Sequence, residues 1–249
     1  TIIQKNQKIS AKPGTESKHD KLLQIYVTKS NAYVCIFVDE GLGGTVNNSQ
    51  LQKSICCITD EFSAVNCLET IKQGFETKLL ICYETREDVI HLVKIVDKIL
   101  PRMLKSEVEI EFHKISKFGK KSDDVLSKNS LITNIMIKSA KEKRISHISL
   151  ATSPLIFPST YVETLQKRIF SAGIIPHIAL SGIDSEIIKN GKEIGMEKYI
   201  PKIEKFLKMN LGKPKSKLKK DEKTVKKIIK VKLGPNNVHE ILDSLEIEH

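Results

Sequence analysis

The chain contains no tryptophan and few aromatic residues, and it has no long apolar run. A helix that crosses a bilayer needs about 20 consecutive apolar residues, and no segment approaches that length. Thr1 to Ser10 is too polar for a signal peptide. The sequence therefore predicts a cytoplasmic protein without a membrane segment.

Cysteine is scarce, and its spacing does not match the common metal-binding motifs. The five cysteines lie in apolar segments and none belongs to a C-x-x-C pair: Cys35, Cys56, Cys57, Cys67 and Cys82. This pattern predicts buried, reduced thiols in a cytoplasmic protein and no metal site. No Ser-His-Asp or H-E-x-x-H arrangement is present. We interpret the scattered histidines as structural: His91, His113, His147 and His177.

Positive charge is concentrated near the end of the chain. The net charge is +11, and the segment from Lys213 to Lys232 holds ten lysines against Asp221 and Glu222. Such a run is typical either of a solvated, flexible tail or of contact with a polyanion such as RNA. No aromatic residue interrupts the lysines, so a base-stacking surface is not indicated. The candidate RNA-binding residues are Lys215, Lys217, Lys219, Lys220, Lys226 and Lys227.

The pattern along the chain predicts three regions. Residues 1–50 contain a polar lead-in, a β-hairpin from Leu22–Thr28 and Ala32–Val38, and a glycine-rich linker. Residues 51–200 alternate between strands and helices. Residues 201–249 form a lysine-rich tail that ends in a short helix over Val238–Leu245.

The middle region predicts an α/β fold with a doubly wound, five-stranded parallel sheet. Five apolar stretches rich in β-branched residues suit strands that are covered on both faces: Ser54–Ile58, Lys78–Tyr83, Val108–Ile115, Ile145–Leu150 and Ile174–Leu180. The helices between them are expected to cross over the sheet. Glu107, Glu109 and Glu111 alternate with apolar residues, which predicts an edge strand with one polar face.

Ligands of such a fold bind beyond the carboxyl ends of the strands, where the strand order reverses. The loops expected there are Thr59–Phe62 and Ala151–Pro158. A turn that binds phosphate needs backbone N–H groups, usually glycines, and no carboxylates. The turn before the helix expected over Ser63–Lys72 has no glycine and holds Asp60 and Glu61. We expect this crevice to be filled by bulky residues, namely Phe62, Phe157 and Pro158.

Several stretches, in order, resemble the tRNA 4-thiouridine synthetase family, also called the thiamine-biosynthesis sulfurtransferase. The family joins an RNA-binding THUMP domain to a PP-loop ATP-pyrophosphatase domain. Gly41-Leu-Gly-Gly44 to Gln50 resembles its G-P-G-G-L-P-V-G-x-Q linker, and Lys72-Gln-Gly-Phe-Glu76 resembles K-R-G-x-E. Ser153–Leu165 is similar to G-[DE]-S-L-G-Q-V-A-S-Q-T-L. Leu180-Ser-Gly-Ile-Asp184 with the residues to Gly195 is similar to P-L-x-G-x-D-K-x-E-I-I and the I-G that follows.

The departures from the family imply that its chemistry has been lost. Alignment on Gly74 places the S-G-G-x-D-S loop on Ile58 to Ser63, where only Ser63 is kept. The segment near Met196–Met209 lacks the family's cysteine. The resemblance leaves Ser63, Gly182 and Asp184 as remnants of a cofactor site, with no catalytic residue. Residues 181–185 also allow a phosphate-loop interpretation, although we favour a helix cap at Asp184. Another possible cap is Thr160 with Glu163.

Three functions remain open from the sequence. The first is a non-catalytic relative of the thiouridine synthetase that binds RNA (tRNA or a ribonucleoprotein) or serves as an assembly module, with no cofactor. The second is an active ATP- and Mg-dependent enzyme that adenylates or thiolates tRNA. The third is a subunit that docks on an acidic protein partner. A separate protein chain could supply the missing THUMP portion.

Overall fold

The computed structural model describes residues 24–35, 49–103, 105–119, 121–182, 192, 195–208, 211, 224–234 and 236–246. The chain divides into two compact units, Thr1–Gly43 and Gly44–His249. In the first unit, β1 (Gln24–Val27) pairs antiparallel with β2 (Ala32–Cys35), as the hairpin pattern predicts. No described helix is long and apolar enough to cross a membrane.

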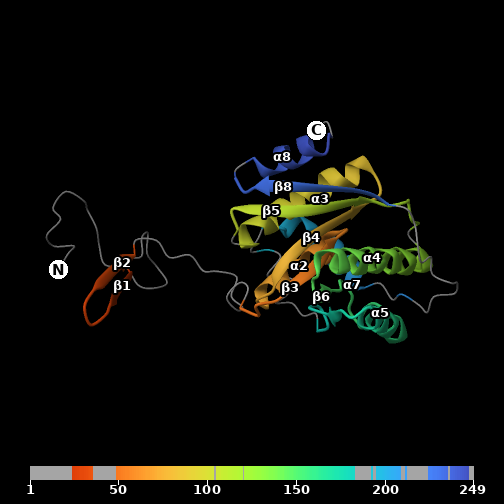
Figure 1. Cartoon of the computed structure of the whole chain (residues 1–249), viewed down its shortest axis with the longest axis horizontal. Coiled ribbons are helices and arrows are strands. Elements are labelled where there is room, and N and C mark those ends of the chain that lie inside the picture. Colours follow the sequence, from red (N-terminus) through yellow and green to blue (C-terminus); the bar gives the residue numbers. More distant parts are fainter. Residues whose placement is uncertain are drawn as a thin grey trace. The chain divides into compact units, whose positions relative to one another are not determined.

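The second unit is built on a six-stranded sheet in the order β7-β6-β3-β4-β5-β8 (Figure 1). The five predicted strands are present and parallel: β3 (Lys53–Ile58), β4 (Glu76–Tyr83), β5 (Glu107–Lys114), β6 (His147–Ser149) and β7 (Ile175–His177). The central strand β3 is buried from Ser54 to Ile58, which fits its apolar composition. The α/β fold class is therefore as predicted.

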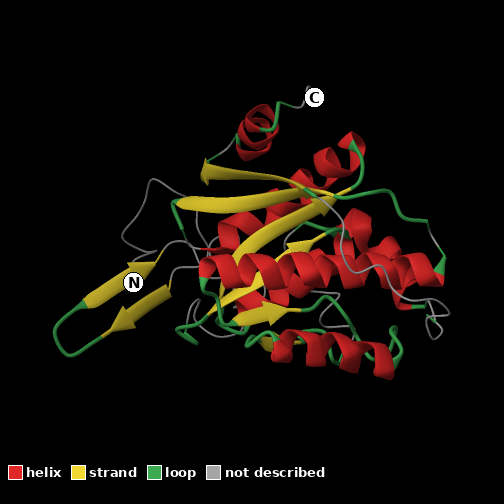
Figure 2. Ribbon diagram, turned by 45° about the vertical axis from the view of Figure 1, so that its right-hand side comes forward, coloured by secondary structure: helices red, strands yellow, loops and turns green. Residues whose placement is uncertain are grey.

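Helices cover both faces of the sheet (Figure 2). Helices α2 (Glu61–Lys72) and α3 (Arg86–Ile99) pack together on one face, and α4 (Ser122–Lys143) and α5 (Ser159–Ser171) pack together on the other. Short helices follow at α7 (Ile200–Leu207) and α8 (Asn237–Ser244), with 3₁₀ turns η1 (Leu100–Met103) and η2 (Glu197–Tyr199). The predicted cap at Thr160 is wrong, because α5 begins at Ser159 without a side-chain cap.

The sixth strand corrects two predictions. Val225–Lys232 forms β8, which pairs antiparallel with the whole of β5, so this part of the lysine-rich segment is not a solvated tail. Consequently β5 is an inner strand, and its prediction as an edge strand is wrong. Ile229 and Val231 of β8 are buried, and α8 packs on α3 and β8. These residues had been assigned to a separate tail, yet they complete the sheet.

The glutamates of β5 and the lysines of β8 face each other across the two paired strands. Across the two strands, Glu107 is opposite Lys232 and Glu109 is opposite Lys230. Opposite charges at facing positions stabilise a strand pair, whereas each stripe alone would repel itself. The polar face of β5 is therefore polar because a lysine-rich strand lies beside it.

The centre of this pairing is the buried carboxylate of Glu111, which is only 1% exposed. It lies 2.7 Å from His113 Nε2 and 3.1 Å from both Lys143 and Lys226 Nζ, and it accepts a 3.0 Å hydrogen bond from Ser139 Oγ. Burial raises the pKa of a carboxyl group, but hydrogen bonds from His113, Lys143 and Lys226 outweigh it and lower the pKa of Glu111 to about 2. The cluster connects β5, α4 and β8.

Candidate functional site

The strand order reverses between β3 and β6, because the chain runs from β3 outward to β4 and β5 before it returns to β6. In doubly wound sheets this switch point is the usual place for a ligand, at the carboxyl ends of the strands. The turn after β3 and the loop of residues 150–158 after β6 meet there. These are the two loops that the sequence predicts.

A capping box occupies the turn after β3. Asp60 is the N-cap of α2, and its Oδ1 accepts a 2.8 Å hydrogen bond from Ser63 N. Ser63 Oγ in return accepts bonds from Thr59 N at 2.8 Å and Asp60 N at 3.0 Å. Three backbone N–H groups of the turn are thus bonded to side chains of the same turn. An anion at this helix N-terminus would have to displace them.

The helix also begins earlier than predicted, at Glu61 rather than Ser63. The reason is the N-cap, because Asp60 has extended backbone angles and the helical hydrogen bonds start directly after it. Glu61 lies in the first turn of the helix, 2.9 Å from His91 Nε2. The loop available to wrap a phosphate is therefore two residues shorter than the sequence indicates.

The space at the switch point is nearly closed, with a volume of about 20 Å³. It is closed by apolar side chains of α4 and α5, namely Ile132, Met136 and Leu165. The predicted fillers are wrong: Phe62, Phe157 and Pro158 do not line this cavity. Phe157 packs instead against the ring of Tyr161 at 6.1 Å. Thr152 lines the cavity, and its buried hydroxyl has no hydrogen-bond partner among the described residues.

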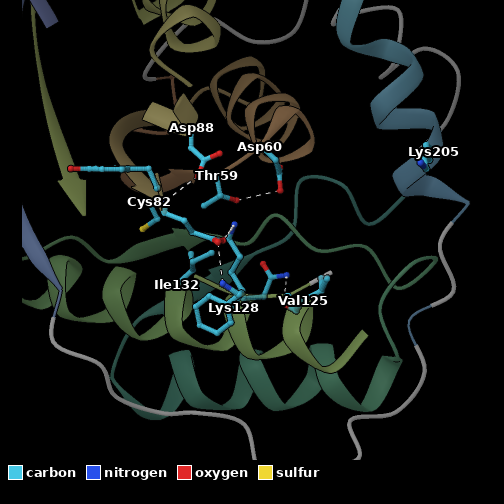
Figure 3. A pocket seen from close by; sticks show the side chains of 13 residues that line it. Thr59, Asp60, Cys82, Asp88, Val125, Lys128, Ile132 and Lys205 are labelled. Atoms are coloured by element: carbon cyan, nitrogen blue, oxygen red, sulfur yellow. Dashed lines mark hydrogen bonds and ion pairs between the residues drawn. The ribbon is translucent and has the colours of Figure 1, made fainter. Parts of the chain in front are cut away.

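An open pocket of about 550 Å³ lies beside it, beyond the carboxyl ends of β3 and β4 (Figure 3). Thr59, Asn129 and Ile132 line both spaces, so they form the wall between them. The remaining lining residues are Asp60, Cys82, Tyr83, Glu84, Asp88, Phe118, Gly119, Val125, Lys128 and Lys205. The sequence does not by itself predict this pocket, although a second capping pattern after β4 marks its position.

The second capping pattern, at the start of α3, resembles the capping box in the turn after β3. Asp88 Oδ2 accepts hydrogen bonds from Thr85 N at 2.9 Å and Glu84 N at 3.3 Å, while Thr85 Oγ1 accepts one from Asp88 N. The N-termini of α2 and α3 both face the pocket with their own carboxylates in place (Figure 3). Glu84 is paired with Lys128 at 2.7 Å and accepts a bond from Phe118 N. The pocket is built from apolar walls and capped helix ends.

Three exposed lysines flank two of the pocket-lining residues along the chain. Lys114 ends β5, and Lys117 and Lys121 lie in the connection to α4; all three are exposed. Phe118 and Gly119 of the same connection line the pocket. We call Lys114, Lys117 and Lys121 the basic rim. It differs from the lysines that the sequence analysis selected.

Of the other predicted site residues, none that the structure describes lines either cavity. Gly182 is exposed and lines neither cavity, whereas Ser63 lines the smaller one. Lys226 is 3.1 Å from Glu111 and 2.7 Å from Glu142, and Lys227 is 3.2 Å from Glu246. That these two lysines bind RNA stays a prediction. In the fold, each of them is already paired with a carboxylate. Asp184 and four of the predicted lysines lie outside the described residues: Lys215, Lys217, Lys219 and Lys220.

Comparison with known proteins supports the fold. No protein-family model matches the chain, and no curated protein gives a significant match. Among solved structures, a 4-thiouridine synthetase–RNA complex with bound ATP matches at 16% identity and a TM-score of 0.55, over 74% of this chain and 51% of that chain. The protein PH1313 from Pyrococcus horikoshii Ot3 matches at 16% identity and a TM-score of 0.47, over 73% and 53%. This chain thus spans about half the length of each.

At this identity the first match shows a shared fold and leaves activity open. The expected likeness to PP-loop proteins therefore holds for the architecture. The capping box after β3 and the closed switch point are properties of this chain, and both bear on whether it can bind a phosphate.

Proposed function

We propose that this chain is a non-catalytic relative of the thiouridine synthetase fold that binds RNA without using ATP. The observation that carries the proposal is the capping box of Asp60 and Ser63, which satisfies the N–H groups at the helix end where a phosphate would bind. Adenylation needs the triphosphate to be held by backbone amides and cations while pyrophosphate leaves.

The charges around this space also oppose the binding of a triphosphate. Asp60 and Asp88 face the space beyond β3 and β4, where each would repel a phosphate oxygen. Two unit charges about 4 Å apart interact by about 4 kcal/mol at an effective dielectric constant of 20. Lys128 offers little compensation, because it is already paired with Glu84. No nucleotide or magnesium cofactor is therefore part of the proposal.

RNA contact is supported by the distribution of lysines. The chain carries a net charge of +11, and the basic rim flanks the pocket-lining residues Phe118 and Gly119 along the chain. Exposed lysines in a connection that lines this pocket, together with carboxylates inside it, suit a phosphate backbone that passes outside the pocket. The solved complex that shares the fold contains RNA, which supports RNA as the class of partner.

Direct binding measurements test both halves of the proposal. With Mg²⁺ present, calorimetry of the full chain with ATP is expected to show no binding at millimolar nucleotide. A micromolar dissociation constant would overturn the non-catalytic half of the proposal. It would favour the second candidate function, an active enzyme, which the 550 Å³ pocket supports.

RNA binding is tested by its dependence on salt. Replacing the basic rim (K114Q, K117Q, K121Q) should weaken binding to a single-stranded RNA and make the slope of log K against log salt less steep by about 2. A charge-matched control replaces three exposed lysines of α4 and α5 elsewhere (K138Q, K141Q, K167Q) and should retain the slope. No RNA binding at about 50 mM salt, or an equal loss in the control, would overturn the RNA-binding half.

A further inference from the structure

The open pocket beyond β3 and β4 has an aromatic residue in its lysine-bearing connection. Phe118 lines the pocket and lies between Lys117 and Lys121 of the basic rim. Its backbone N–H donates a 3.0 Å hydrogen bond to Glu84 Oε2, which ties this connection to the turn that follows β4. An aromatic side chain among lysines is typical of single-stranded RNA sites, because the cations hold the backbone while the ring stacks on a base. The segment Lys213–Lys232 has no aromatic residue.

The size and lining of the pocket suit one base. Its volume of about 550 Å³ lies within the range of about 300–1,000 Å³ that is usual for small-molecule sites. Tyr83 and Phe118 provide aromatic surface, and Val125 and Ile132 provide apolar surface. Carboxylates line the same space, so the phosphates of a bound strand are better placed outside it, on the basic rim. A base can therefore lie inside the pocket while its backbone stays outside.

Asp88 offers this pocket a hydrogen-bond acceptor. Among the described residues, the backbone N–H groups of Glu84 and Thr85 both donate to Asp88 Oδ2, which leaves Oδ1 for a ligand. Asp60 lies at the neighbouring helix end and lines the same pocket (Figure 3). An ionised carboxylate accepts hydrogen bonds from the amino group of a base, but it has no proton to donate to a base carbonyl.

An acceptor of this kind distinguishes the four RNA bases. Guanine presents a ring N–H and an amino group side by side, so one carboxylate can accept from both. Adenine and cytosine each present a single amino group. Uracil presents one N–H between two carbonyl oxygens, and a carboxylate repels these oxygens. A carboxylate in the pocket therefore favours guanine most and uracil least.

We propose that the pocket binds one unpaired base of a single-stranded RNA, with guanine preferred and uracil disfavoured. Asp88 accepts hydrogen bonds from the base, Phe118 stacks on it, and the basic rim holds the backbone outside. This inference rests on the proposed RNA-binding function and adds base specificity to it. Two lysines of the pocket lining could instead donate to uracil carbonyls. Lys128 is engaged by Glu84 at 2.7 Å, which leaves Lys205 of α7 as the lysine that would favour uracil.

The experiment compares RNA heptamers that contain uridine throughout, except for guanosine, adenosine, cytidine or uridine at the centre. Binding to the full chain is measured by fluorescence anisotropy at about 50 mM salt and above. The guanosine heptamer is expected to bind at least about tenfold more tightly than the all-uridine heptamer, with adenosine and cytidine between them. The slope of log K against log salt should be the same for all four, because the phosphates in contact are the same.

Variants of the pocket locate the preference. Asp88→Asn keeps the size of the side chain but replaces one acceptor oxygen by a donor, so it should remove most of the preference for guanosine. The matched control is Thr85→Ala, which disrupts the same capping box from a residue that does not line the pocket and should keep the preference. Phe118→Leu should weaken binding of the guanosine heptamer about fivefold or more through lost stacking.

The outcomes separate this inference from the proposed function. Equal affinity for the four heptamers, with a salt slope typical of backbone contact, would overturn the inference and leave the proposed function standing. A preference for uridine would also overturn it, as would a loss of preference in Thr85→Ala as complete as in Asp88→Asn. Absence of RNA binding would overturn both. The heptamer comparison uses the unaltered chain, so it decides even if a variant does not fold.

Free guanosine tests the other source of the same base. We expect the nucleoside alone to bind only at millimolar concentration, because it lacks the phosphates that reach the basic rim. A micromolar dissociation constant for guanosine, with no gain in affinity for the heptamer, would overturn RNA as the ligand of this pocket.

Discussion

The turn after β3 and the pairing of β5 with β8 both depend on carboxylates, but over very different distances along the chain. Asp60 bonds to a backbone N–H three residues away, whereas Glu111 meets Lys226 of a strand near the end of the chain. The first arrangement closes a potential binding site, and the second completes the sheet. The role of a carboxylate that bonds to nearby residues can be predicted from the sequence. The role of one that pairs with a distant residue cannot be predicted until that partner is identified.

The largest expected effect is removal of β8 and α8. A chain that ends at Leu211 loses four buried apolar side chains: Ile229, Val231, Ile241 and Leu242. Each contributes about 1.5–3 kcal/mol by burial, so the sum is comparable to the whole stability of a domain. We expect no cooperative melting transition by circular dichroism. Removal of the separate unit Thr1–Gly43 is the control and should leave Tm unchanged. A truncated chain with an unchanged Tm would restore the interpretation as a solvated tail.

Next in size is Glu111→Ala. The substitution removes the buried anion that Lys143, Lys226 and His113 share, which should lower the free energy of unfolding by about 3–5 kcal/mol. Urea denaturation measures it. The matched control is Glu163→Ala, which removes an exposed pair with Lys167 and should change stability by less than about 1 kcal/mol. Similar losses in both variants would show that the cluster adds nothing beyond surface pairing.

The same carboxylate predicts a pH dependence. Its pKa is lowered in the folded chain from 4.5 to about 2, so its contribution is complete above about pH 4.5 and is lost as pH falls toward 2. The difference in urea midpoint between the parent chain and Glu111→Gln should therefore shrink as the pH falls through this range. A constant difference would indicate that Glu111 titrates normally.

The smallest effect belongs to the local carboxylate. Asp60→Ala removes the N-cap of α2 and should cost about 0.5–2 kcal/mol of stability, while Asp60→Asn should retain most of it. Thr85→Ala, in the equivalent box of α3, is the matched control and should lose a similar amount. A loss in Asp60→Ala as large as that in Glu111→Ala would remove the distinction between the two regions.

Local patterns account for what the sequence could predict. Three features depend on residues that are near one another in sequence, and the structure contains them as predicted. They are the buried strands, the acidic turn and the closing helix at the C-terminus. Strand β8 was missed because alternation of lysines with Ile229 and Val231 resembles a solvated basic run until the glutamates of β5 are placed beside it. The fillers of the switch point were missed because Ile132 and Met136 reach it from α4, a packing that no local pattern specifies.

The late arrival of β8 has a consequence for synthesis on the ribosome. His113 and Thr224 touch across 111 residues of sequence, so the flank of β5 stays uncovered until the residues of β8 have been made. A bare, flat strand is a template for aggregation, and charged residues along it discourage that. The glutamate row on β5 is expected to discourage such pairing until the same side chains receive their lysines.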